Sequence, residues 1–190
     1  MRPEDLAALR RKYEEMLRLR LAHDAGDPED PRRALRALAS QFPGALRELD
    51  GLPLDVIQGR IAALAAAEAA GGAAPAPWMV AIDRFHVLTR GALCVKTWLA
   101  KRAATGVIDV LDGEAGRADV ERTFAAAAGS LCWADDARAW AGDFARIVSP
   151  PRGRVTELVF ARIAAELGCS TADVRHLVFG ELRPRPLRKA

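Results

Sequence analysis

Aromatic residues and cysteines are scarce in this chain, and no long hydrophobic run occurs. Phe, Trp and Tyr make up 6% of the 190 residues, which disfavours sheets because strands are rich in aromatic and β-branched residues. The three cysteines, Cys94, Cys132 and Cys169, have no short pairwise spacing, which indicates buried, reduced thiols rather than a disulfide framework or a zinc site. No apolar leader or bilayer-length run is found. We therefore expect a cytoplasmic protein with no membrane partner.

Motifs of the familiar cofactor enzymes are also missing from the sequence. It contains no phosphate-cradling glycine loop, no nucleophile elbow, no His-Glu-x-x-His pattern and no paired-cysteine metal spacing,. These motifs supply the phosphate, nucleophile or metal chemistry of common enzyme classes. We therefore expect no metal and no cofactor, and we do not expect an enzyme of these kinds.

Alanine accounts for much of the 51% hydrophobic content, and this composition favours close-packed helices. The sequence predicts an all-α protein, a multi-helix bundle. Apolar periodicity, caps and breakers predict helices at 3–22, from Asp30-Pro31 onward, around Leu46 and Leu49, and at 53–70, 78–102, 118–128, 135–148 and 155–167,. The glycine- and proline-rich segment 71–77 is expected to be a loop or linker, and 107–111 a short extended segment or a buried loop.

Positive charge is concentrated near the C-terminus. From Arg146 to the end there are nine Lys or Arg against four Asp or Glu, a net charge of +5, whereas the other 145 residues carry nineteen against twenty-one, a net charge of −2. We expect a helical bundle over residues 1–148 and a basic segment over 149–190. Such an asymmetry is typical of a phosphate-facing appendage, and equally of a basic tail that keeps a protein soluble.

Residues 160–179 read as two short helices separated by one glycine. Gly168 suits the left-handed conformation that ends a helix. Ser170 is a good N-cap for the next helix, and Asp173 stands where the acidic partner of a capping box is found. The apolar or small residues of the pattern are Ile163, Ala164, Leu167, Cys169, Val174 and Leu177.

These residues resemble the helix-turn-helix family of DNA-binding motifs over about 20 of the 190 residues. The resemblance implies a second helix that enters the major groove of double-stranded DNA. It places Ser170, Thr171, Ala172, Arg175 and His176 toward the groove, with Arg175 donating to a guanine edge. The flanking basic residues would then hold phosphates: Arg152, Arg154, Arg162, Arg183, Arg185, Arg188 and Lys189,. The implied function is a DNA-binding transcriptional regulator.

A tight structural corner of two helices would satisfy the same packing pattern. The alternative function is therefore a protein-interaction or scaffold module. An exposed apolar patch on the Leu6–Leu17 helix, with Arg175 and His176 held in internal salt bridges, would favour such a module,. On the same helix, a seam of Leu6, Leu9, Tyr13 and Met16 could join two copies into a homodimer, although a seam of this length is more often intramolecular core,.

One constellation on the predicted helix 78–102 suggests a third function. Asp83, His86 and Arg90 are spaced at i, i+3 and i+7 and so share one face,. Such a stripe could line the pocket of a ligand-binding or enzymatic bundle, with His86 as acid or base beside Asp83. The alternative is that these residues form the solvated or loop-capped edge of an otherwise buried helix.

Overall fold

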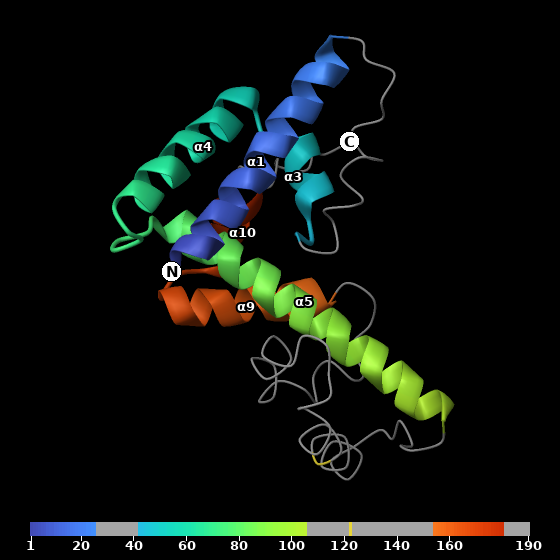
Figure 1. The fold of residues 1–190 in the computed structure, drawn as a ribbon. Helices are drawn as coiled ribbons and strands as arrows, with labels where there is room; N and C mark the ends of the chain where they lie inside the picture. The colour runs from blue at the N-terminus through green and yellow to red at the C-terminus, as the bar shows by residue number, and fades with distance from the viewer. Residues whose placement is uncertain (26–41, 106–121, 123–153, 181–190) are drawn as a thin grey trace, which may run out of the picture. The chain divides into compact units, whose positions relative to one another are not determined.

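The computed structural model describes residues 1–25, 42–105, 122 and 154–180 (Figure 1). In these ranges every secondary-structure element is a helix and no strand occurs, so the all-α prediction is confirmed. The helices are α1 (Pro3–Asp24), α3 (Ala45–Gly51), α4 (Leu54–Ala69), α5 (Pro77–Ala104), α9 (Arg154–Leu167) and α10 (Thr171–Phe179). The elements predicted from Asp30-Pro31 onward, at 107–111, 118–128 and 135–148 lie, apart from residue 122, outside the described residues.

The helix boundaries follow from local signals. Helix α1 begins with Pro3, and Glu4 and Asp5 lie in its first turn, where acidic side chains favour the positive end of the helix dipole,. The segment predicted as a loop at 71–77 lies between α4 and α5, and Gly71 and Gly72 both take positive φ angles there. Every predicted helix within the described ranges is therefore found within about two residues of its expected ends.

The chain divides into two compact units. The first contains Met1–Phe85 and Phe160–Ala190, and the second contains His86–Val159. The helix-turn-helix-like segment 160–179 thus belongs to the same unit as α1, α3 and α4. The predicted division into a helical bundle over 1–148 and a helix-turn-helix-like segment with a basic tail over 149–190 stays a prediction.

The core of the first unit forms where α4 runs alongside α1 (Figure 1). The seam Leu6, Leu9, Tyr13 and Met16 is at most 2% exposed, because α1 turns this face inward. The seam is therefore intramolecular core, and it does not offer the exposed apolar patch that a scaffold module or a homodimer built on it would need.

An aromatic cluster connects the two sequence segments of the first unit. Phe85 stacks on Phe160 with ring centroids 5.6 Å apart, and Phe179 meets both rings edge-on at 5.3 and 5.9 Å. Gly44, with φ of +87°, makes room for this cluster, since a Cβ atom there would lie 3.0 Å from the Phe179 ring. The cluster fixes the C-terminal end of α10 in the core.

Helix α5 contributes to both units and has 28 residues. Met79, Ile82, Leu88 and Val95 are buried, in agreement with its predicted core position, whereas Leu93 is 51% exposed. The prediction of buried thiols is corrected in part, because Cys94 on this helix and Cys169 are only half-buried; Cys132 lies outside the described residues. None of the described helices combines the length and apolarity needed to cross a membrane.

Candidate nucleic-acid interface

The segment 160–179 has the local geometry that its sequence predicts. Helix α9 ends at Leu167, Gly168 takes a φ of +65°, and α10 begins at Thr171. Ser170 caps α10: its hydroxyl accepts a hydrogen bond from the Asp173 amide at 3.1 Å, and the Asp173 carboxylate accepts one from the Ser170 amide at 2.9 Å. This is the predicted capping box. The helix pair is therefore a defined corner with its second helix capped at the N-terminus.

The C-terminal end of α10 is anchored in the first unit by side-chain and backbone contacts. Arg60 of α4 donates to the carbonyl oxygen of Leu177 at 2.8 Å and to that of Val178 at 3.2 Å. These carbonyls have no partner within the helix, so a guanidinium satisfies them and also meets the negative end of the helix dipole. Gly180 then ends the helix with a φ of +67°. The C-terminal end of α10 is thus held in the protein, and its N-terminal end is the one that faces solvent.

Most of the predicted groove-facing residues are exposed. Ser170, Thr171, Ala172 and His176 are exposed, whereas Arg175 is half-buried. The Arg175 guanidinium carbon lies 5.2 Å from the centroid of the Phe160 ring, a cation–π distance,. Residues at the start of a recognition helix are those that reach base edges in helix-turn-helix proteins. The exposed N-terminal half of α10 is therefore the candidate reading surface.

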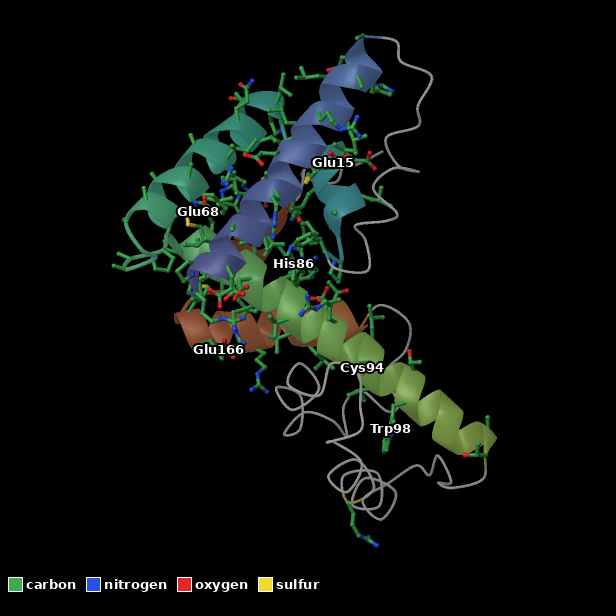
Figure 2. The ribbon with its side chains drawn as sticks, in the orientation of Figure 1. Glu15, Glu68, His86, Cys94, Trp98 and Glu166 are labelled. Atoms are coloured by element: carbon green, nitrogen blue, oxygen red, sulfur yellow. The ribbon has the colours of Figure 1, made fainter. Side chains whose placement is uncertain are left out.

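The predicted phosphate-holding arginines differ in their surroundings. Arg162 lies 3.4 Å from the carboxylate of Glu166, which is on the same helix and is labelled in Figure 2. Arg84 of α5 donates two hydrogen bonds of 2.8 and 3.0 Å to that carboxylate. These two arginines keep the pKa of Glu166 below its usual value, chiefly through the Arg84 hydrogen bond. Arg162 therefore serves an intramolecular ion-pair network. Arg154 is the first residue of α9, and Arg152, Arg183, Arg185, Arg188 and Lys189 lie outside the described residues.

The described helix pair carries no net charge. Residues 154–180 contain three arginines and three acidic residues. The excess of +5 found from Arg146 onward therefore comes entirely from 146–153 and 181–190, which hold six basic residues and one acidic residue. Within residues 146–190, the net positive charge that attracts phosphates therefore lies in these flanking segments and not in the helix pair,.

A buried polar cluster behind α10 was not foreseen from the sequence. Glu48 of α3, completely buried, pairs with the ammonium group of Lys12 and accepts a hydrogen bond of 2.6 Å from the Tyr13 hydroxyl. Arg60 donates to the same hydroxyl at 2.7 Å and lies 3.5 Å from Glu48. Burial lowers the pKa of Lys12 and raises that of Tyr13. The cluster links α1, α3 and α4 to the C-terminal carbonyls of α10.

A sequence signal for this cluster does exist. Lys12 falls on the apolar face of α1 between Leu9 and Met16, and Arg60 falls between Ile57 and Leu64 on the buried face of α4. A charged residue at a core-facing position needs an opposite charge or hydrogen-bond partners, because burying it alone is costly. Two basic residues at such positions predict a buried acidic partner, which is Glu48.

The predicted stripe Asp83, His86 and Arg90 lies on α5. Asp83 belongs to the first unit, and burial, with the charge of Asp5 as a second cause, raises its carboxyl pKa. His86, marked in Figure 2, is 4% exposed and Arg90 is half-buried, and both belong to the second unit. His86 is therefore a buried residue and not part of a solvated edge. A catalytic or ligand-binding role for the stripe stays a prediction.

Comparisons with known proteins return no relative for this chain. Neither a protein family, nor a curated protein, nor a solved structure matches it. Among the described residues, no three His, Cys, Asp or Glu side chains gather as a set of metal ligands.

Proposed function

We propose that this protein is a cytoplasmic DNA-binding regulator that inserts the N-terminal half of α10 into the major groove. The observation that carries the proposal is the orientation of α10: its C-terminal end is held by Arg60 and the aromatic cluster, while Ser170, Thr171 and Ala172 at its start are exposed. A recognition helix needs this combination of a rigid base and a free leading turn.

The roles of the individual residues follow from their contacts. The Ser170 hydroxyl and the Asp173 carboxylate are occupied by the capping box, so they position the helix. Thr171 and His176 are exposed and can donate to base edges or phosphates,. Arg175, supported by the Phe160 ring, supplies the bidentate donor suited to guanine,. Phosphate contacts are assigned to the basic residues of 146–153 and 181–190.

Fluorescence anisotropy with a duplex that the full chain has selected from a random-sequence pool tests the proposal. Binding by the full chain should weaken steeply with added salt, because each neutralised phosphate releases condensed counterions. Arg175→Ala should weaken binding by about tenfold, the loss typical of one bidentate base contact. Arg18→Ala is the matched control, since Arg18 is an exposed arginine on α1 paired with Glu15. The absence of salt-dependent binding, or equal losses in the two variants, contradicts the proposal.

A second candidate, a protein-interaction module with a structural corner, is favoured by the zero net charge of residues 154–180 and by the Arg162–Glu166–Arg84 network. In that case α10 serves as a docked cap of the bundle. The same titration separates the two functions: a protein-interaction module leaves duplex anisotropy unchanged at low salt, and Arg175→Ala then changes only stability.

A further inference from the structure

A surface groove lies in the first unit beside the anchored end of α10. Its volume is about 300 Å³, which is at the lower end of the range of small-molecule sites. Three elements form it: α4, the first turn of α5, and the C-terminal half of α10. Its apolar lining consists of Val56, Gly59, Ala63, Trp78 and Leu177, and its polar lining of Arg60 and His176.

Gly59 has no side chain to fill the groove, although glycine destabilises the helix in which it lies. It lies in the interior of α4, where glycine is less favourable than alanine by about 1 kcal/mol. A Cβ atom at Gly59 would meet no atom within 4 Å, so packing inside the chain does not require glycine here. A larger side chain at this position would occupy the groove instead.

The polar groups that line the groove are donors rather than acidic acceptors. No carboxylate is among its lining residues. The Trp78 ring makes an edge contact with Tyr13 and lies 5.2 Å from the Arg60 guanidinium, and in the described part of the chain its indole N–H has no acceptor. Arg60 keeps 8% of its surface exposed. Such a lining complements an acceptor group on a ligand.

The buried polar cluster behind the groove carries a net positive charge, which also favours an anionic ligand. The buried cluster holds two cations, Lys12 and Arg60, against one carboxylate, Glu48. Lys12 is sealed from solvent, so Arg60 is the member through which the cluster reaches the groove. A positive charge in excess, removed from bulk water, attracts an anion more strongly than an exposed one does.

We propose that the groove binds a small organic carboxylate with a flat apolar body. The carboxylate accepts hydrogen bonds from Arg60 and the Trp78 indole N–H, and the apolar body lies over Gly59 against Val56 and Leu177. Arginine matches a planar carboxylate, and the indole ring suits a flat partner. This site does not depend on DNA binding, since the carboxylate is assigned to Arg60 and Trp78 and neither residue is assigned to DNA.

NMR titration of the full chain tests the site with phenylacetate and its neutral isostere phenylacetamide. The indole N–H signal of Trp78, assigned with Trp78→Phe, should shift saturably with phenylacetate. The amide should bind at least about tenfold more weakly, because it lacks the charge that Arg60 recognises. Equal binding of the two compounds, or no saturable shift from either up to about 10 mM, overturns the proposal.

A pair of variants on α4 locates the site. Gly59→Leu fills the groove and should reduce phenylacetate affinity by at least about tenfold, while far-UV circular dichroism shows that the fold is kept. Ala62→Leu adds the same side chain at an exposed α4 position outside the groove lining and should bind as the unmodified chain does. Unchanged affinity in Gly59→Leu, or an equal loss in both variants, contradicts the proposal.

Discussion

At the residue scale, Glu48 is the residue on which most of the buried polar cluster depends. It accepts from Tyr13 and pairs with Lys12, with Arg60 3.5 Å away. The net value of a buried ion pair is often small, because desolvation offsets the attraction. Removing one partner is different, since the other charge then stays buried without compensation.

We predict that Glu48→Gln lowers the free energy of unfolding at pH 7 by about 3–5 kcal/mol, the cost of breaking a buried pair. Urea denaturation measures it. Glu15→Gln is the control: it removes the exposed contact with Arg18 and should cost less than about 0.5 kcal/mol. Similar losses in the two variants would contradict the role assigned to Glu48.

The stability of the Glu48→Gln variant should depend on pH. Burial already lowers the pKa of Lys12 below the ordinary value of 10.5, and loss of Glu48 lowers it further. A lysine whose pKa is lower in the folded state binds fewer protons there than in the unfolded state, so stability rises with pH between the two values. Glu48→Gln should therefore regain stability as the pH approaches 10.5, and a loss of stability over this range, measured by urea denaturation against the unmodified chain, would contradict the account.

Two glycines with positive φ offer a second test at this scale. Gly44→Ala combines left-handed strain with a Cβ atom 3.0 Å from Phe179, whereas the Cβ atom of Gly168→Ala meets nothing within 4 Å. We predict a cost of about 1–2 kcal/mol for Gly168→Ala, from strain alone, and about 2–4 kcal/mol for Gly44→Ala, where overpacking adds to the strain. Thermal denaturation ranks the two, and a larger loss for Gly168→Ala would contradict the packing described.

At the element scale, α10 is a nine-residue helix whose two ends are fixed by different means. A capping box fixes its first turn, and Arg60 with Gly180 fixes its last. A helix this short is not stable by itself in water. Its order therefore depends on these end contacts and on the burial of Val174, Val178 and Phe179.

We predict that Ser170→Ala loosens the start of α10 without unfolding the bundle. The loss of an N-cap costs about 1 kcal/mol, so amide exchange in the first turn should accelerate while that of α1 is unchanged. The Ser170 hydrogen bonds hold the pKa of Asp173 below its ordinary 3.8, and in the variant this pKa should rise toward 3.8. An unchanged carboxyl titration in NMR would contradict the capping role.

The sign of the acid dependence follows from this pKa. A carboxylate whose pKa is lower in the folded state stabilises the fold at pH values above its unfolded-state pKa. This stabilisation is lost as the pH falls through the folded-state pKa. The capping box should therefore persist at pH 4 and open only below the ordinary aspartate value of 3.8.

Element boundaries could be predicted because their causes are local. Pro3, Gly168 and Ser170 act through the backbone within a few residues of themselves,. The buried cluster could not be read in the same way, since Lys12, Glu48 and Arg60 come from three helices and meet only after these pack. The groove beside Trp78 has the same origin, because it needs α4, α5 and α10 in place.

At the scale of the whole molecule, charge is divided unevenly between parts of the chain. Residues 154–180 are neutral, and the excess of +5 belongs to the segments on either side. The proposed function accordingly gives base contact to α10 and electrostatic attraction to the flanking basic residues. In protein–DNA complexes these two tasks are often performed by different groups, since phosphate contacts position a protein and base contacts specify the sequence.

The measurement that tests the central claim most directly is the effect of one negative charge at the start of α10. Ala172→Glu places a carboxylate on the exposed leading turn, where the helix dipole tolerates it,. Ala66→Glu makes the same charge change at an exposed position of α4. If α10 enters the major groove of DNA, Ala172→Glu should weaken duplex binding by at least about tenfold in anisotropy at low salt. Ala66→Glu should weaken it far less. Equal affinities of the two variants for duplex DNA would contradict the account.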